Sequence, residues 1–477
     1  MKILFLISEV EGFTKTGGLA DVGKSLPLAL KALGHDVRIV KPYYKEMTHK
    51  NVKSKKIASA SLDTVRHIFD FNIYEVPMGE VPIYCVDYPD FFYRDGLYSD
   101  DYEAFADNGE RFSFFSQASL QVAKALDFRP DIIHCNDWHT SMACYFVKQD
   151  KSGFFNQTRT LLTIHNGAFQ GIHAYHDVPS CHHSQPLAEQ HESQSHINFL
   201  KLGIEYADKI NAVSPNYGEE LKTPLGSHHL FDTFNTRRED LSGILNGCDY
   251  DQWDPSSDKL LPNNYSVDSL DGKGQCKKSL QKQMSLPERK TVPIIGMVCR
   301  LTSQKGFDFI TPILSRLLEH NIQLIIIGSG DPAIAGQLGH AAKLHPKKMA
   351  FYQGFSNELA HLLEAGSDFF LMPSLFEPCG LNQMYSLAYG AVPIVRAVGG
   401  LKDTVIDLDA NPSASTGFVF EHPDSEALLN CLRRALLFYR EYPKKYVEMQ
   451  CRGMETRFTW AQAAVNYQAL YNKMNQE

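Results

Sequence analysis

A lysine followed by paired glycines stands near the start of the chain, in KTGGLADV, where Lys15, Gly17 and Gly18 lie between a short apolar run and a helical pattern. Glycine has no Cβ, so an anion can approach the main-chain N–H groups, and a following helix adds the positive end of its dipole. The stretch indicates a phosphate-binding turn, although a plain strand-to-helix turn fits the same residues. Because the spacing is neither G-x-G-x-x-G nor G-x-x-x-x-G-K-[ST], it disfavours a dinucleotide dehydrogenase and a P-loop NTPase.

Two cations on one short segment, Arg300 and Lys305, follow another apolar run, in CRLTSQKG. An arginine fork and a lysine point charge on one loop can converge on a single anion. The alternative is that both are solvated surface cations. Facing a diphosphate, they would stabilise the charge that grows as a nucleotide leaves, which is the role of a divalent metal elsewhere. We therefore expect no metal cofactor.

Other candidate chemical groups follow apolar runs in the same way. Glu377 stands between an aromatic residue and a proline, where it could contact sugar hydroxyls, stabilise positive charge or cap the next helix. Asp137 could orient a hydroxyl or cap its own helix, and His165 could be a base, a hydrogen-bond partner or a packing residue. Cys379 lacks an evident base, so we interpret it as a contact residue rather than a nucleophile.

Two patterns raise the possibility of a metal site. The D-x-D tripeptides at 249–251 and 407–409 are one, but neither follows a strong apolar run and carboxylates are common in turns. The other is a group of histidines: His173, His176, His182, His183, His191 and His196. These lack a clear i, i+4 pair on a helix and any cysteine arrangement beyond Cys181, so a solvated loop is the favoured interpretation.

The elements that must position these side chains are short continuous apolar runs separated by helical stretches. The runs lie at 2–7, 37–40, 81–86, 132–135, 161–164, 210–213, 294–298, 324–327, 351–353, 369–372, 393–395 and 418–420. Continuous apolar strands interleaved with helices predict parallel sheets covered on both faces, and the two sets predict two doubly wound α/β domains. Ligands bind beyond the carboxyl ends of such strands, so we expect an active site in a cleft between the domains.

The remaining segments complete this organisation. The polar stretch 249–290 indicates a domain boundary with an irregular connection. An apolar pattern at helical spacing predicts an amphipathic closing helix over 460–474. We interpret 1–10 as a first strand and not a signal peptide, because Glu9 and Glu11 interrupt the apolar run and no small-residue cleavage site follows.

Composition excludes several classes of protein. The chain has 477 residues, of which 43% are hydrophobic and 21% charged, as expected for two or three soluble domains. A net charge of -8 argues against a nucleic-acid partner, which requires a basic face. No apolar run approaches the ~18 residues of a membrane span. Ten scattered cysteines without a C-x-x-C pair suit reduced thiols in a cytoplasm.

Eight motifs occur in order along almost the whole chain: KTGGLADV, NDWH, TIHN, ILNGCDYDQWDP, CRLTSQKG, IIGSGDP, PSLFEPCGLNQMYSLAYG and VGGLKDTV. Together they closely resemble the bacterial glycogen synthases and plant starch synthases. The resemblance implies a GT-B fold, with two Rossmann-like doubly wound parallel-sheet domains facing a deep cleft. We place a glucan-acceptor domain at 1–245, a nucleotide-sugar donor domain at 246–456, and a C-terminal helix that crosses back to the first domain at 457–477.

The resemblance also implies an activity in glycogen biosynthesis: transfer of glucose from ADP-glucose to the non-reducing end of an α-1,4-glucan, with retention of configuration and without a cofactor. With no evident nucleophile, we expect a same-face mechanism in which the departing phosphate receives the acceptor's proton. Strict preference for ADP-glucose over UDP-glucose, the oligomeric state and the extent of domain closure stay open.

The resemblance assigns donor-binding roles by matching positions. Lys15, Gly17 and Gly18 would approach the donor phosphates from the first domain, while Arg300 and Lys305 would neutralise the diphosphate from the second. The rest of the donor-binding set comprises Phe355, Glu377, Cys379, Gly380, Leu381 and Asn382. Glu377 would position or stabilise the donor glucose, and main-chain groups near Leu381 would support the diphosphate.

On the sugar side, the resemblance implies that Asp137 and His165 shape the acceptor site and hold the transferring glucose. Asn246 would contact a glucose hydroxyl. Together with Glu377, Arg300 and Lys305, Asp137 and His165 form the expected catalytic set.

The chain departs from the family pattern at several positions. Tyr385 stands where related retaining transferases often repeat a glutamate, Phe355 where many carry tyrosine, and Asn382 where threonine is common. The segment 170–198 is unusually rich in histidine and 223–240 is atypical. Phe355 and Asn382 leave nucleotide preference open, whereas Tyr385 is what the glycogen synthases carry; the two segments leave acceptor handling open.

Two other functions remain as alternatives. A catalytically weak glucan-binding or nucleotide-sugar-binding protein on the same fold would be favoured by loss of Lys15, Arg300, Lys305 or Glu377, all of which are present. An NAD-linked oxidoreductase would need a G-x-G-x-x-G turn followed by an acidic residue, and the chain lacks it.

Overall fold

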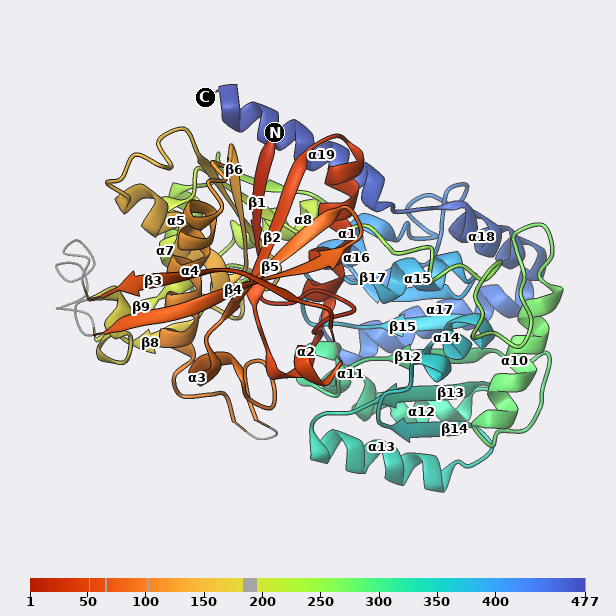
Figure 1. Cartoon of the computed structure of the whole chain (residues 1–477). Helices are drawn as coiled ribbons and strands as arrows, with labels where there is room; N and C mark the ends of the chain where they lie inside the picture. Colours follow the sequence, from red (N-terminus) through yellow and green to blue (C-terminus); the bar gives the residue numbers. More distant parts are fainter. Residues whose placement is uncertain (51, 65–66, 101–102, 183–194, 477) are drawn as a thin grey trace. The chain divides into compact units, whose positions relative to one another are not determined.

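The computed structural model describes residues 1–50, 52–64, 67–100, 103–182 and 195–476. The chain forms two compact units. Unit 1 contains Met1–Asn246 and Trp460–Glu477, and unit 2 contains Gly247–Thr459 (Figure 1). The first boundary between the units therefore follows residue 246 and the second follows residue 459, whereas the sequence predicted domain boundaries after residues 245 and 456. Within the described residues, no helix is long and apolar enough to cross a membrane.

Unit 1 is built on a mixed sheet whose strand order, for the described residues, is β11-β10-β7-β6-β1-β2-β5-β4-β3. The strands are β1 Lys2–Leu6, β2 Asp36–Pro42, β3 Lys55–Asp63, β4 Ile68–Met78, β5 Val81–Asp87, β6 Ile132–Asn136, β7 Arg159–Ile164, β10 Lys209–Ala212 and β11 Leu241–Gly243. All pairs from β11 to β5 are parallel, whereas β3 and β4 add antiparallel pairs at one edge.

The six apolar runs predicted in the first half are confirmed as β1, β2, β5, β6, β7 and β10. The expectation of a purely parallel sheet was wrong for the β3–β4 edge. Those two strands alternate in burial along much of their length, so they lack the continuous apolar run that identifies a strand covered on both faces. A short antiparallel pair, β8 Ile172–Ala174 with β9 His196–Asn198, lies outside this sheet.

Helices cover the unit 1 sheet. They are α1 Gly18–Ala32, α2 Lys45–His49, α3 Pro89–Phe92, α4 Asn108–Ala125, α5 Trp138–Gln149, α7 Phe199–Tyr206, α8 Pro215–Leu221, α9 Phe231–Thr236 and α19 Trp460–Gln476. The predicted closing helix is confirmed as α19, which packs against α1 within the core of unit 1. Its Tyr471 hydroxyl lies 2.8 Å from His134, and its Tyr467 hydroxyl accepts from Asn211 at 2.9 Å.

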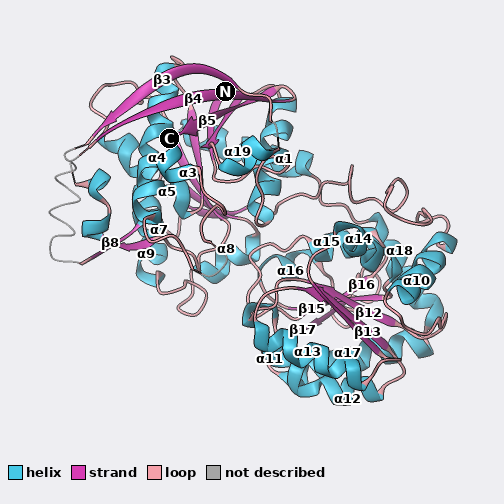
Figure 2. Ribbon diagram, turned by 60° about the horizontal axis from the view of Figure 1, so that its bottom comes forward, coloured by secondary structure: helices cyan, strands magenta, loops and turns pink. Residues whose placement is uncertain are grey.

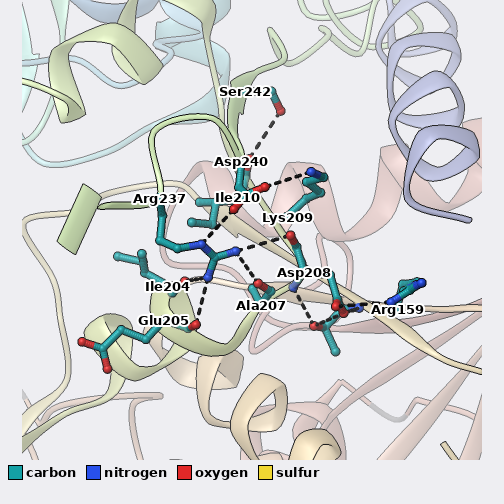
Figure 3. Close-up of polar contacts among 11 residues, drawn as sticks. Arg159, Ile204, Glu205, Ala207, Asp208, Lys209, Ile210, Arg237, Asp240 and Ser242 are labelled. Atoms are coloured by element: carbon teal, nitrogen blue, oxygen red, sulfur yellow. Dashed lines mark hydrogen bonds and ion pairs between the residues drawn. The ribbon is translucent and has the colours of Figure 1, made fainter. Parts of the chain in front are cut away.

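The atypical segment 223–240 is integrated into unit 1 through Arg237 (Figure 3). Its guanidinium donates to the carbonyls of Ile204 at 2.6 Å and Ala207 at 2.6 Å, at the C-terminal end of α7. It also pairs with Asp240 at 2.9 Å, and Asp240 accepts from Lys209 at 2.8 Å. Arg237 therefore satisfies helix carbonyls that would otherwise lack partners and fastens α7 to β10.

Unit 2 contains a sheet in which every described pair is parallel, with the order β14-β13-β12-β15-β16-β17. The strands are β12 Ile294–Val298, β13 Gln323–Gly328, β14 Met349–Gln353, β15 Phe369–Met372, β16 Val392–Arg396 and β17 Phe418–Phe420. All six match predicted apolar runs. Numbered from β12, this is the 3-2-1-4-5-6 order of a doubly wound Rossmann fold, so the predicted fold class is confirmed.

Helices lie on both faces of the unit 2 sheet (Figure 2). They are α10 Asp271–Gln283, α11 Phe307–Ile310, α12 Leu314–Glu319, α13 Pro332–Leu344, α14 Asn357–Gly366, α15 Asn382–Ala388, α16 Gly399–Thr404, α17 Ser425–Glu441 and α18 Pro443–Glu455. The predicted irregular connection over 249–290 was wrong in part, because it includes α10. This helix buries Lys273 and Lys277, so its buried face carries no apolar periodicity to reveal it.

Candidate functional site

The candidate donor site of unit 2 lies at the carboxyl ends of β12 and β15, which are neighbours in the sheet. The chain leaves these two strands toward opposite sides of the strand order, which makes their ends a topological switch point where open α/β sheets bind ligands. The loop 299–306 after β12 carries Arg300 and Lys305, and the loop 373–381 after β15 carries Glu377. Strand order thus brings these three predicted residues to one edge of the sheet.

Lys305 and Glu377 form an ion pair with 2.7 Å between Nζ and Oε2, and their side chains are only 17% and 9% exposed. The same carboxylate oxygen accepts from the Ser374 hydroxyl at 2.9 Å. In the described part of the chain Glu377 caps no helix, so that interpretation was wrong. The surface-cation interpretation was also wrong for Lys305, since its ammonium is mostly buried against a carboxylate.

Arg300 differs from Lys305 in its surroundings. It is exposed, and it forms no ion pair with any residue that the structure describes. Its guanidinium can therefore bind an external anion without breaking an internal pair. Burial raises the pKa of the neighbouring Cys299 thiol to about 12, so this thiol stays protonated near neutral pH.

Glycines allow the loops of this site to pack closely. Gly306 has a φ of +82°, and a Cβ there would clash with the Pro373 carbonyl of the other loop. Gly399, at φ +41°, similarly lies against the Glu377 carbonyl, and the Gly400 N–H donates to that carbonyl at 3.1 Å. The start of α16 therefore supports the turn that carries Glu377.

The remaining donor-site candidates lie at the starts of α15 and α14. Asn382 donates through its side chain to the Val298 carbonyl at 2.9 Å, which ties α15 to the end of β12. Cys379 is buried beside it, Gly380 has a φ of +70° and Leu381 is the N-cap residue of α15. Phe355, after β14, is 73% exposed and presents an aromatic ring that can stack on a base.

In unit 1, Asp137 follows β6 and has a φ of +56°, which is rare outside glycine. Its buried carboxylate accepts from the His165 N–H at 2.7 Å and the Asn166 N–H at 3.3 Å. Its side chain does not cap α5, so that interpretation was wrong; it holds the turn after β7 instead. Burial raises the pKa of this carboxyl to about 7, although the two N–H bonds oppose the shift.

His165 is fixed as a neutral imidazole. Its Nε2 lies 2.9 Å from Asn136 Oδ1, and the Asn136 amide group donates to the Leu6 carbonyl at 3.0 Å. The amide oxygen therefore faces the ring, which requires a proton on Nε2. Burial lowers the pKa of His165 to about 3. Such an imidazole is a hydrogen-bond partner and a very weak base near neutral pH.

The loop between β1 and α1 carries the paired glycines. Gly17 is the N-cap residue of α1, and a Cβ built on it would meet nothing within 4 Å among the described residues. Lys15 pairs with Asp21 at 2.7 Å and is 47% exposed. The phosphate role of this turn stays a prediction.

Two features of unit 1 extend the sequence-based picture. Glu9 is buried and accepts from the Thr16 N–H at 2.5 Å and from the Tyr98 hydroxyl at 2.6 Å, so it shapes the glycine turn. Sequence reasoning missed it, and its only signal was a carboxylate at the end of an apolar strand.

Asn246 is buried, and its Oδ1 has no hydrogen-bond partner among the described residues. A buried amide oxygen without a partner costs stability unless a ligand supplies a donor.

The metal-site alternatives gain no support. Asp407 pairs with Arg434 at 2.6 Å, and Asp409 pairs with the same guanidinium. His173 lies in β8 and is partly buried, which corrects the solvated-loop interpretation for it. His196 is exposed but lies in β9 and not in a loop, and His183 and His191 lie outside the described residues. Within the described ranges, no three His, Cys, Asp or Glu side chains gather as metal ligands would.

Comparisons with known proteins cover the whole chain. The starch synthase catalytic domain family matches residues 2–236, and the glycosyl transferases group 1 family matches 280–449. The chain is 49% identical to a glycogen synthase of Aeromonas salmonicida, with 99% of this chain and 98% of the relative covered. A glycogen synthase of Photobacterium profundum is 47% identical, with 99% and 94% covered.

A solved structure agrees with these relatives. The catalytic domain of starch synthase IV from Arabidopsis thaliana, bound to ADP and acarbose, superposes with a TM-score of 0.91 at 29% identity, covering 100% of this chain and 99% of that one. The two-domain α/β architecture is therefore that of a starch synthase. On full-length identity and on fold, the chain belongs to the family of the glycogen and starch synthases.

Proposed function

We propose that this chain is a retaining glucosyltransferase that moves glucose from ADP-glucose to the non-reducing end of an α-1,4-glucan, and so elongates glycogen. The observation that carries the proposal is the meeting of Arg300, Lys305 and Glu377 at the switch point of the unit 2 sheet. The glycogen synthase relatives support it, as does the starch synthase that binds ADP and acarbose.

The donor diphosphate binds Arg300 and Lys305 in this proposal. Arg300 contributes an exposed guanidinium, and Lys305 contributes an ammonium already oriented by Glu377 at 2.7 Å. As the C1–O bond to the diphosphate breaks, negative charge grows on the phosphate oxygens, and two fixed cations stabilise it. From unit 1 we assign Lys15, Gly17 and Gly18 to the same phosphates, on the family resemblance.

Glu377 acts by charge rather than as a nucleophile. Its carboxylate accepts hydrogen bonds from Lys305 and Ser374. Both bonds draw electron density from the carboxylate oxygen, which makes that oxygen a weaker nucleophile toward C1 of the donor glucose. We therefore propose a same-face reaction. The acceptor hydroxyl oxygen bonds to C1, the C1–O bond to the diphosphate breaks, and the hydroxyl proton passes to a departing phosphate oxygen. ADP leaves, and no further reactant is needed.

The sugar hydroxyls are assigned to unit 1. Asp137 and His165 form a rigid, hydrogen-bonded pair at the ends of β6 and β7, where His165 keeps a lone pair on Nδ1. Asn246 contributes an unpartnered amide oxygen that can accept from a glucose hydroxyl. Phe355 is assigned to the adenine, with Cys379, Gly380, Leu381 and Asn382 lining the rest of the donor.

We further propose that no metal or other cofactor takes part and that the enzyme works in the cytoplasm. The paired cations give the first point its physical basis. For the second, none of the ten cysteines, all of which lie within the described part of the chain, forms a disulfide, as expected in a reducing compartment.

The test is direct. Purified protein is incubated with labelled ADP-glucose or UDP-glucose and a glycogen primer, in a chelating buffer without metal, and label in polymer is counted. Transfer from ADP-glucose in the chelating buffer supports the proposal. Binding of ADP without any transfer would instead favour the alternative of a catalytically weak binding protein.

A further inference from the structure

Two helices of unit 2 begin directly after the proposed donor loops. α14 follows the turn 354–356 that carries Phe355, and α15 follows the turn 377–381 that carries Glu377. Both pack in one apolar cluster on the same face of the sheet as α10, and Figure 2 shows the three helices along that face. The separation of α14 and α15 therefore determines where these loops lie.

An aromatic stack joins the two helices. The Trp253 ring lies 3.6 Å from the ring of His361 on α14, with 17° between the planes. It also lies 4.3 Å from the ring of Tyr385 on α15, at 10°. Tyr385 belongs to the first turn of α15, where its N–H donates to the Leu381 carbonyl at 3.0 Å. One indole thus connects α14 to the start of α15.

A buried carboxylate makes a second connection. Asp258 accepts from His361 Nδ1 at 2.8 Å and from the Tyr389 hydroxyl at 2.6 Å, and its other oxygen accepts from the Leu260 N–H at 2.8 Å. Burial alone would raise the pKa of Asp258, but the bonds from His361 and Tyr389 outweigh it and hold the pKa below its usual value. The ionised group therefore ties α14 to Tyr389, the C-cap residue of α15.

The C-terminal ends of both helices share a third connection. The buried Lys273 ammonium donates to the carbonyls of Ala365 and Tyr389, both at 2.9 Å. The Tyr265 hydroxyl donates to the Tyr389 carbonyl at 2.7 Å. Lys273 thereby satisfies a carbonyl at the end of α14 and the carbonyl of the C-cap residue of α15, and Tyr265 adds a second bond to the latter.

We propose that Trp253, Asp258, Tyr265 and Lys273 form a brace that sets the spacing of α14 and α15 and so positions the donor loops. Trp253 and Asp258 are its positioning residues. The brace also gives Tyr385 a role, because a stacking ring occupies the position at which related transferases often carry a second glutamate. The inference rests on the proposed donor role of the two loops.

The test compares donor and acceptor kinetics. Trp253→Leu removes the stack, whereas Trp253→Phe keeps an aromatic ring. We expect Trp253→Leu to raise the KM for ADP-glucose about tenfold with the KM for glycogen unchanged, and Trp253→Phe to recover most of the loss. Asp258→Asn, which preserves shape, should raise the donor KM about fivefold.

The matched control is Phe438→Leu, which truncates a buried ring of α17 in the apolar cluster on the other face of the sheet. It should lower the melting temperature and leave the donor KM unchanged. An equal rise of the donor KM in this control, or an unchanged donor KM in both Trp253→Leu and Asp258→Asn, would overturn the brace.

The two proposals can fail separately. If the wild-type protein transfers no glucose, the proposed function fails, and ADP affinity measured by calorimetry on the same variants then tests the brace alone. If the wild type is active and both Trp253→Leu and Asp258→Asn have wild-type donor kinetics, only the brace fails. Should Trp253→Leu not fold, Asp258→Asn and Trp253→Phe decide the question.

Discussion

The proposed donor loops of unit 2 and the Asp137–His165 pair of unit 1 both lie at the carboxyl ends of parallel strands. The two regions differ in the charge of their side chains. In unit 2 a buried ammonium is matched to a buried carboxylate, and a neighbouring guanidinium is exposed. In unit 1 burial raises the pKa of Asp137 to about 7 and lowers the pKa of His165 to about 3. Both shifts favour uncharged groups.

This difference fits the two parts of a nucleotide-sugar reaction. A diphosphate needs fixed positive charge, and a buried ion pair orients the cation before the ligand arrives. Sugar hydroxyls need oriented neutral donors and acceptors instead. Five variants test this division, beginning with the change of largest expected effect.

Lys305→Ala should remove most of the activity. It deletes one proposed phosphate ligand and leaves Glu377 buried without its cation, so we expect kcat to fall about 10²–10³-fold. Glucan binding, measured by co-sedimentation with glycogen, should hardly change. Arg300→Ala should show the same pattern with a smaller loss. Lys343→Ala, at an exposed lysine of unit 2, is the control. Equal losses of turnover and glucan binding would contradict the diphosphate role.

Glu377→Gln should preserve the fold and impair transfer by about 10²-fold in kcat, because the amide keeps the shape but loses the charge that faces Lys305. Circular dichroism and a melting curve check the fold. Wild-type turnover in this variant would remove Glu377 from the site.

His165→Gln tests the neutral side of the comparison. We expect kcat to fall about tenfold through loss of an oriented hydrogen bond, with the shape of the pH–rate profile between pH 5.5 and 8.5 unchanged. The profile should keep its shape because His165, with a pKa of about 3, is uncharged across this whole pH range. Disappearance of an acid limb in the variant would show that His165 titrates as a base.

Asp137→Asn should change stability by an amount that depends on pH. The folded carboxyl has a pKa raised to about 7 from its model-peptide value of 3.8, so the folded state binds more protons than the unfolded state between these limits. Its ionisation therefore costs stability as the pH rises from 4 to 7, by up to about 4 kcal/mol.

The asparagine variant lacks that cost. Its melting temperature, measured against wild type by calorimetry, should improve steadily from pH 4 to pH 7 and stay level above. A difference that does not vary with pH would show that Asp137 is ionised throughout. The Asp150 carboxyl has a pKa lowered through its bonds to Lys124 and Ser152, despite the opposing effect of burial. Wild type should therefore gain stability over Asp150→Asn as the pH rises to about 4, and the difference between the two should stay level from about pH 5 to pH 7.

Prediction from sequence succeeded where the signal was local. Every continuous apolar run became a strand, and the strand-end position of Glu377 and Arg300 follows from the runs alone. It failed at β3 and β4, whose burial alternates, and at α10, whose buried face carries lysines. In these elements tertiary contacts stabilise residues that local pattern assigns to the surface.

The sequence by itself determined the family, the fold class and the residue types of the candidate site, since motifs and apolar runs are read along the chain. Only the tertiary structure decided the partners: Glu377 with Lys305, the Asp137 carboxylate with the His165 N–H, and Trp253 with both α14 and α15. Each pairing joins residues 28 to 132 positions apart, so it depends on strand order and helix packing. Burial, which shifts the pKa of Asp137 and His165, is likewise a property of the folded chain.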